Sequence, residues 1–310
     1  MKDFIKAVVF GHAIGDALGV PVEFIPREKL DKTPVTDMLG YGIYPVPAGA
    51  WSDDTSMSLC ALDSLANGKL DYDEIMRNFD RWYNHDEFTP TDWMFDVGTT
   101  CSLAIDNYVV GKMPYDECGL SADDSNGNGS LMRIHPFVLF AEYTDRGDEM
   151  IDIIDEASSL THAHRRSLVG CGIYAFILRA IMKNQSKDAV YSGLAEAKEY
   201  YEGESELKHY SRLFSPDFAS TDRSDIKSTG YVVHTLEAAV WCMLTTESYE
   251  ECVLKAVNLG EDTDTVAAVA GGLAGAMYGF DAIPQKWRDG ILKKEFIDEM
   301  CERACRNWKK

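Results

Sequence analysis

Two short acidic segments each carry several carboxylates at the point where a helix is expected to begin. Residues 51–55 (WSDDT) come before an apolar run that starts at Met57, and residues 260–265 (GEDTDT) come before Val266. Aspartate, serine and threonine are common helix N-caps, but a cap needs only one oxygen acceptor. Clustered like charges are costly unless a cation neutralises them, and carboxylate and hydroxyl oxygens suit Mg²⁺, Mn²⁺ or Ca²⁺ better than zinc. Together the two segments indicate a site for a hard divalent cation.

The elements that must position these side chains are helices. Apolar residues recur at helical rather than alternating spacing, and no convincing pair of alternating strands is present. The pattern predicts an all-α fold, a single compact multi-helix domain that covers residues 1–310. The expected helices beyond the N-terminal one are 55–66, 72–83, 158–183, 230–244, 263–278 and 286–308.

Two of the expected helices carry an unusual number of small residues. Gly11, Gly15 and Gly19 recur at a spacing of four, and residues 271–276 (GGLAGA) form a similar surface. Each glycine costs about 1 kcal/mol of helix propensity relative to alanine, so another interaction must compensate. A glycine stripe lets a second backbone approach closely. We therefore expect tight helix–helix packing in the core, which also fixes where the helix ends lie.

Three segments do not fit regular structure. Residues 36–49 contain three glycines and two prolines, and a loop of this length in a compact domain is usually functional. Residues 123–129 (DDSNGNG) are equally rich in turn-forming residues. Residues 196–228 are highly polar, and we interpret them as a helix followed by a surface loop rather than as a domain boundary.

Composition narrows the class of protein. Values of 45% hydrophobic and 26% charged residues are typical of a folded globular chain. Lys and Arg number 30 against 51 Asp and Glu, so the net charge is −21, which argues against a nucleic-acid-binding or membrane-surface protein. Eight cysteines without a C-x-x-C pair indicate small buried hydrophobic residues in a reducing compartment. With neither a secretory leader nor an uninterrupted apolar run of membrane-spanning length, we expect a cytoplasmic protein.

Six short motifs occur in an order that resembles the ADP-ribosylglycohydrolase family, from about residue 4 to about residue 280. Each motif is short, but six in the right order argue against chance. The resemblance implies an all-α fold and a cleft that holds two Mg²⁺ or Mn²⁺ ions. It also implies that ADP-ribose would be cleaved in that cleft from a modified protein side chain or from a small ADP-ribosyl compound. The motifs are residues 15–19 (GDALG) with Glu23, 51–55 (WSDDT), 96–100 (DVGTT), 127–133 (GNGSLMR), 161–162 (TH) and 260–265 (GEDTDT).

The resemblance also implies a role for each matching residue. It makes Glu23 a metal ligand or the acid/base group, and Asp96 a second carboxylate that faces the scissile bond. His162 would lie along the ADP-ribose, and Tyr231 would stack on the ligand. The implied metal ligands are Ser52, Asp53, Asp54, Asp262, Asp264 and Thr265, and the implied diphosphate-binding residues are Ser125, Gly127, Asn128, Gly129 and Ser130.

These implied roles agree with the chemistry of the residues. Glycosidic cleavage normally uses two carboxyl groups, and Glu23 and Asp96 fit the roles of acid and base. Two metal ions can chelate ribose hydroxyls, orient the sugar and lower the pKa of bound water. Backbone N–H groups of a Gly/Asn/Ser loop can hold a diphosphate without basic residues, and the metal charge explains how so acidic a protein could bind an anion.

Three alternative interpretations compete with this one. A haloacid-dehalogenase-type phosphatase would use residues 262–266, but it needs a buried strand before them and 256–261 is a poor one. An isoprenoid enzyme with a D-D-x-x-D motif is opposed by Met57 in the third acidic position. A non-catalytic ADP-ribose- or metal-binding or structural derivative has no physical reason to keep so many costly charges together. The acceptor, the choice between Mg²⁺ and Mn²⁺, the oligomeric state, the order of acid and base and any role of Asp16 stay open.

Overall fold

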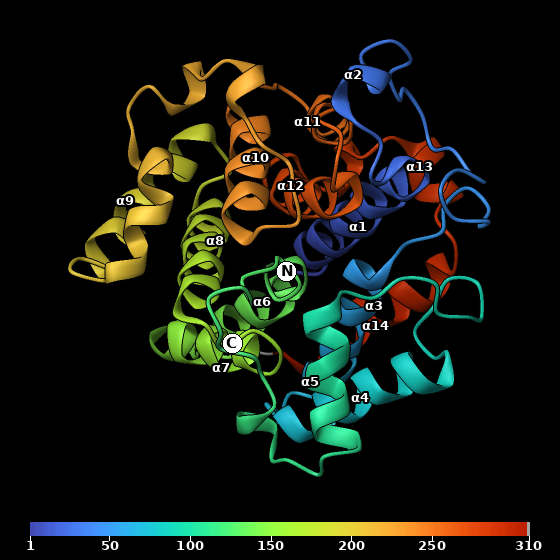
Figure 1. Ribbon diagram of the computed structural model, residues 1–310, viewed down its shortest axis with the longest axis vertical. Helices are drawn as coiled ribbons and strands as arrows, with labels where there is room; N and C mark the ends of the chain where they lie inside the picture. The colour runs from blue at the N-terminus through green and yellow to red at the C-terminus, as the bar shows by residue number, and fades with distance from the viewer. Residues whose placement is uncertain (309–310) are drawn as a thin grey trace.

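Helices cover all the segments where the apolar periodicity predicts them, although two of the predicted helices are interrupted, and further helices join them. The computed structural model describes residues 1–308, and its regular structure consists of α-helices and short 3₁₀ segments, with no strand among these residues. The prediction of an all-α fold is confirmed (Figure 1). The α-helices are α1 (Lys2–Gly19), α2 (Arg27–Leu30), α3 (Asp53–Leu65), α4 (Tyr72–His85), α5 (Thr99–Val109), α6 (His135–Tyr143), α7 (Met150–Ser159), α8 (Arg165–Lys183), α9 (Lys187–Tyr200), α10 (Val232–Leu244), α11 (Tyr249–Val257), α12 (Thr263–Tyr278), α13 (Gln285–Gly290) and α14 (Lys294–Asn307).

Helices α1 and α12 form the central pair, with α8, α9 and α10 on one side and α3, α4 and α5 on the other (Figure 1). Their glycine faces meet, and a Cβ atom at Gly15 would overlap the carbonyl oxygen of Ala267. Only glycine permits this approach, so the predicted tight helix–helix packing is confirmed. At the end of the pair the Thr263 hydroxyl donates to the carbonyl oxygen of Gly19 at 2.8 Å. The residues that follow α1 therefore lie beside the start of α12.

The prediction of one continuous helix over residues 158–183 is wrong near its start, because the helix is interrupted between α7 and α8. The backbone in the break pairs with a distant segment instead of continuing the helix. The Leu120 N–H donates to the carbonyl oxygen of Thr161 at 2.9 Å, and the Ala163 N–H donates to that of Leu120 at 2.8 Å. His162, between them, forms an isolated parallel β-bridge with Leu120 rather than part of a helix.

The predicted helix 286–308 is also interrupted, between α13 and α14. In the turn between them the Leu292 N–H donates to the carbonyl oxygen of Gly49 at 3.0 Å. This hydrogen bond joins the turn to the loop 36–49. Residues 36–49 and 123–129 contain no helix or strand, as predicted. The polar stretch after α9 forms 3₁₀ segments rather than a long coil.

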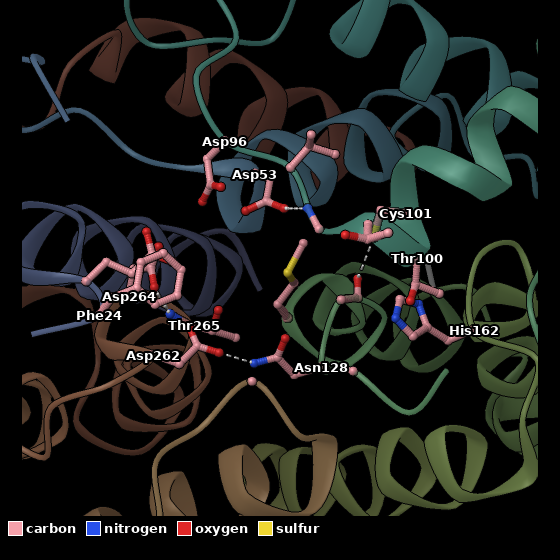
Figure 2. A pocket seen from close by; sticks show the side chains of 18 residues that line it. Phe24, Asp53, Asp96, Thr100, Cys101, Asn128, His162, Asp262, Asp264 and Thr265 are labelled. Carbon is pink, nitrogen blue, oxygen red and sulfur yellow. Dashed lines mark hydrogen bonds between the residues drawn. The ribbon is translucent and has the colours of Figure 1, made fainter. Parts of the chain in front are cut away.

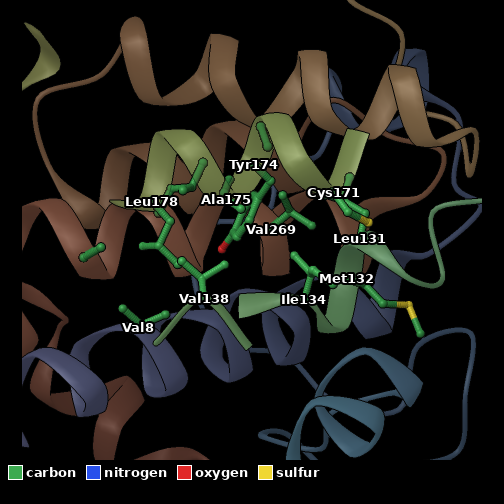
Figure 3. Close-up of a cluster of buried hydrophobic side chains, with 14 of the residues drawn as sticks. Val8, Leu131, Met132, Ile134, Val138, Cys171, Tyr174, Ala175, Leu178 and Val269 are labelled. Atoms are coloured by element: carbon green, nitrogen blue, oxygen red, sulfur yellow. The ribbon is translucent and has the colours of Figure 1, made fainter. Parts of the chain in front are cut away.

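The core collects apolar side chains from helices that are distant in the sequence (Figure 3). Val8 of α1, Val138 of α6, Tyr174 of α8 and Val269 of α12 are all buried there. Lys2–Val22 is long and apolar enough to cross a membrane by length and composition, but 89% of that window is buried inside the protein, as in a core helix. All eight cysteines are free, and seven of them are buried as the sequence predicts.

Candidate active site

A cavity of about 320 Å³ lies where the first turns of α3, α5 and α12 face the loops before α2, α6, α8 and α10 (Figure 2). Its walls come from segments far apart in the sequence, which the contact between α1 and α12 and the break before α8 bring together. The predicted site residues that line it are Glu23, Asp53, Asp96, Gly127, Asn128, Gly129, His162, Asp262, Asp264 and Thr265.

A carboxylate from α1 holds the first turn of α3. Asp16 accepts hydrogen bonds from the Ser52 N–H at 2.9 Å, the Thr55 N–H at 3.0 Å and the Thr55 hydroxyl at 2.6 Å. Ser52 is the N-cap of α3, and its hydroxyl accepts from the Asp54 N–H at 3.3 Å. Asp16 therefore anchors the segment that presents the first acidic cluster. The sequence left Asp16 without a role, although an aspartate in the apolar, glycine-rich half of this helix was the available signal.

The two predicted acidic segments meet in the structure. The Thr265 hydroxyl, at the start of α12, donates to Asp54 Oδ2 at 3.2 Å, at the start of α3. On the other side of the same helix start, Asn128 Nδ2 donates to Asp262 Oδ2 at 2.7 Å. The first turns of both helices thus present carboxylate and hydroxyl oxygens to one region, with the Gly/Asn loop against them.

A further group of carboxylates joins this region. Glu23, Asp96 and Asp264 each offer an oxygen within 4.8 Å of the others, an arrangement that could hold a metal ion. The sequence motifs place Asp96 apart from both acidic segments, and only the fold brings it beside Glu23. Glu23 and Asp96 therefore face one shared position.

Burial makes these carboxylates resist ionisation. Asp53, Asp54 and Asp264 have pKa values raised well above the ordinary range, first by burial and then by neighbouring carboxylates. The pKa of Glu23 is raised to about 9, again first by burial and then by the charge of Asp96. Such a cluster stores electrostatic repulsion that protons or a cation must relieve.

The residues present fit a hard divalent cation. Glu23 Oε2 and Asp54 Oδ1 are buried and have no hydrogen-bond partner among the described residues. Within residues 1–308, no lysine or arginine lines the cavity. The available donors are carboxylate and hydroxyl oxygens, the set that magnesium and manganese prefer over zinc. A cation here would satisfy the orphaned oxygens and the clustered charge together.

The loop predicted to bind diphosphate reaches the cavity with only part of its residues. Gly127, Asn128 and Gly129 line it, and a Cβ atom at Gly129 would lie 2.9 Å from the His162 ring. Ser130 is fully buried behind the loop, where its hydroxyl accepts from Ser158 at 2.8 Å. Ser125 is also buried and outside the lining, with its hydroxyl 3.4 Å from Asp124 Oδ1.

The two remaining predicted ligand contacts differ in position. His162 lines the cavity and is buried, with Nδ1 2.8 Å from the Thr161 hydroxyl. Tyr231 lies outside the lining, next to Gly127 through an isolated β-bridge, and the Arg166 guanidinium lies 6.0 Å from its ring centre. Tyr231 therefore flanks the Gly/Asn loop rather than the carboxylates.

Comparison with known proteins identifies the relationship. The family model described as ADP-ribosylglycohydrolase matches residues 1–310. The chain belongs to the ADP-ribosylglycohydrolase family. A solved structure described as an ADP-ribosylglycohydrolase-related protein complex superposes with a TM-score of 0.83 at 30% identity, covering 99% of this chain and 98% of that one. The family resemblance found in the motifs is thereby confirmed.

Two curated relatives cover most of the chain. "ADP-ribosylarginine hydrolase Tri1" of Serratia proteamaculans is 33% identical over 311 residues, which cover 97% of this chain and 78% of the relative. "ADP-ribosyl-[dinitrogen reductase] glycohydrolase" of Rhodospirillum rubrum is 30% identical over 300 residues, which cover 93% of this chain and 90% of the relative. Membership in this family supports hydrolysis of ADP-ribose linkages.

In this member of the family the cavity also has walls to which the sequence analysis gave no role. Phe24 is 63% exposed at the cavity, and its backbone has a φ of 58°, held by a hydrogen bond from its N–H to the Glu261 carbonyl oxygen. Its position directly after Glu23 was the only signal. The other lining residues are Val97, Gly98, Thr99, Thr100, Cys101, Met132 and Gly230.

Proposed function

We propose that this chain is a Mg²⁺- or Mn²⁺-dependent hydrolase that cleaves the bond between ADP-ribose and the guanidinium group of an arginine side chain. The observation that carries the proposal is the convergence of both acidic segments with Glu23 and Asp96 on one cavity. The family supports hydrolysis of an ADP-ribosyl linkage, and the metal and the acceptor are the parts that we add.

The metal site that we propose uses the first turns of α3 and α12. Asp54, Asp264 and Thr265 would hold the cation from opposite helix starts, with Asp53 and Asp262 beside them. Two bound ions, when present, would chelate ribose hydroxyls and lower the pKa of a water molecule. The orphaned buried oxygen of Asp54 supports this assignment.

We assign proton transfer to Glu23 and Asp96. Both line the cavity, and both lie in segments between helices, so they are available to the reacting bond. A buried carboxyl group with a raised pKa can carry a proton near neutral pH, which suits Glu23 as the donor to a leaving nitrogen. Asp96 would then accept a proton from the attacking water.

The diphosphate would lie against the Gly/Asn loop. Gly127 and Gly129 carry no side chain between the loop backbone and the cavity that they line, and Cys101 and His162 pack close against Gly129. Asn128 is fixed by its bonds to Asp262 and Thr235. Backbone N–H groups in such a loop hold anions without a basic side chain. The absence of lysine and arginine from the described lining agrees with this mode of binding.

Two features favour a guanidinium acceptor. The relative from Serratia proteamaculans is named as an ADP-ribosylarginine hydrolase and is similar to this chain over 97% of its length. The exposed ring of Phe24 stands at the cavity next to Glu23, and aromatic faces attract planar cations. An arginine acceptor therefore suits the cavity edge at Phe24, called the rim below, better than an uncharged hydroxyl acceptor does.

The test incubates the purified chain with arginine-linked and serine-linked ADP-ribosyl peptides, each with Mg²⁺, Mn²⁺ or a chelator, and measures released ADP-ribose by mass spectrometry. We expect metal-dependent release from the arginine peptide. Release only from the serine peptide would refute the acceptor, and equal release in chelator would refute the metal. Binding of ADP-ribose without any release would identify a non-catalytic derivative.

The contribution of the rim is tested with two variants. Phe24→Ala should raise KM for the arginine peptide severalfold, because the stacking face is lost, whereas Phe24→Tyr should retain the parental KM. Equal KM values in both variants and the parent would remove Phe24 from acceptor recognition.

A further inference from the structure

Arg133 is a fully buried cation without a carboxylate partner in the described chain. Its side chain is 0% exposed, and its guanidinium lies 4.8 Å from the ring centre of Phe79. Nη2 donates to the Thr161 hydroxyl at 2.8 Å, while Nε and Nη1 have no hydrogen-bond partner. A buried charge is costly, and this one directs a hydrogen bond toward the cavity wall.

The Thr161 hydroxyl links Arg133 to His162. Its oxygen lies 2.8 Å from Arg133 Nη2 and 2.8 Å from His162 Nδ1. A guanidinium can only donate, so the threonine oxygen accepts from Arg133 and keeps one proton to give. The Cys101 thiol also lies near this hydroxyl, but sulfur is a far weaker acceptor than an imidazole nitrogen. Nδ1 of His162 is therefore the stronger acceptor for the threonine proton.

The direction of this chain of hydrogen bonds fixes the imidazole tautomer. When Nδ1 accepts a hydrogen bond in a neutral ring, the proton of the ring is on Nε2. A proton on Nδ1 would also point toward the buried positive charge of Arg133. Burial lowers the pKa of His162 to about 3, so the ring is neutral.

The Nε2 side of His162 faces the cavity. His162 is a lining residue, and a Cβ atom at Gly127 would lie 3.4 Å from Nε2. Nε2 has no protein hydrogen-bond partner among the described residues, whereas Nδ1 is fully engaged by Thr161. A ligand oxygen beside the Gly/Asn loop would therefore meet an N–H group.

We propose that Arg133 and Thr161 are positioning residues that hold His162 as a fixed Nε2–H donor to an acceptor oxygen of the bound ligand. The identity of that ligand as an ADP-ribosyl group rests on the proposed function. Through this arrangement a buried cation orients a hydrogen-bond donor at a cavity whose described lining has no basic side chain. Arg133 itself stays behind the wall and does not touch the ligand.

The tautomer is measured directly on the unliganded protein labelled with ¹⁵N-histidine, because protonated and unprotonated ring nitrogens have well-separated NMR shifts. The signals of His162 are assigned by their loss in His162→Gln. We expect an unprotonated Nδ1 and a protonated Nε2. A proton on Nδ1, or a mixture of both tautomers in the parent protein, would overturn the proposal.

Two threonine variants test the link itself. Thr161→Val keeps the shape but removes the hydroxyl, so His162 should become a mixture of tautomers and ADP-ribose should bind up to about tenfold more weakly. Thr161→Ser restores the hydroxyl and should restore both properties. A parental tautomer and affinity in Thr161→Val would overturn the proposal. Arg133→Met should give the same mixture, and Thr161→Val decides the question should that variant not fold.

The NMR result and the function are separable. A parent protein that binds no ADP-ribose would refute the proposed ligand, while the fixed tautomer in the unliganded protein would still hold. A mixed tautomer together with normal ADP-ribose hydrolysis would refute the positioning role and leave the proposed function intact.

Discussion

Removal of one carboxylate from the acidic site should change stability in opposite ways with and without metal. In metal-free protein Asp54 is buried among other carboxylates and has an oxygen without a partner. Asp54→Asn replaces a carboxyl group that must be either ionised or protonated at a cost with a neutral group of the same size, so the metal-free variant should melt at or above the parental temperature. The same change removes a proposed ligand, so the variant should lose its stabilisation by Mg²⁺.

The size of the metal effect follows from linkage. A ligand at a hundredfold excess over its Kd stabilises the folded state by about 2.7 kcal/mol for one site. Unfolding entropy of about 2.1 cal/mol/K per residue gives about 0.65 kcal/mol/K for this chain of 310 residues. One saturated site should therefore raise Tm by about 4 °C in the parent.

Scanning calorimetry in chelator and in Mg²⁺ at pH 7.5 provides the assay. Asp148→Asn is the matched control, because Asp148 is exposed on a 3₁₀ segment far from the acidic segments in the sequence. It should show the parental rise. The reasoning fails if the parent does not respond to millimolar Mg²⁺ or Mn²⁺, or if Asp54→Asn shows the same rise as the parent.

Three further predictions concern the cavity. Gly129→Val should weaken ADP-ribose binding in calorimetry, because the added side chain would meet Cys101 Sγ and the His162 ring. The control Gly98→Ala should bind as the parent does, because its Cβ meets nothing within 4 Å. Equal ADP-ribose affinities of Gly129→Val and the parent would make the loop a simple connector. Glu23→Gln should lower single-turnover cleavage by about 10²–10⁴-fold, more than it lowers affinity, and near-normal turnover would remove Glu23 from proton transfer. Metal-free protein should lose stability as pH rises from about 5 toward 9. The pKa of Glu23 is raised from 4.5 to about 9 in the folded state, so the folded chain keeps this proton after the unfolded chain has lost it. Melting in chelator across this pH range should show a falling Tm and a smaller fall in Glu23→Gln, and a rising Tm would contradict the prediction.

Local patterns were sufficient to predict the all-α class, many of the helices and the two acidic segments. The stripe of Gly11, Gly15 and Gly19 predicted a close helix contact, because a stripe of costly residues needs a packing reason. The structure supplies that reason in α12, and the contact also brings Glu23 to the start of α12. Motif order then linked the acidic segments to one family, and the family model agrees.

Features that depend on distant pairings were not predictable in this way. The helical periodicity of 158–183 continues through the break before α8, and the pairing with Leu120 that causes the break lies outside any local window. Asp96 follows an irregular segment, so no periodic pattern could place it beside Glu23. Asp16 was visible in the sequence, but its hydrogen bonds to the first turn of α3 require the tertiary fold.

The central claim is that both acidic segments form one cation site in the cavity. Anomalous diffraction from crystals grown with Mn²⁺ tests it most directly, because the signal locates the metal independently of activity. The account predicts manganese in the cavity, within coordination distance of Asp54 and Asp264. Manganese bound only elsewhere, or a cavity without an anomalous peak at saturating Mn²⁺, would contradict it.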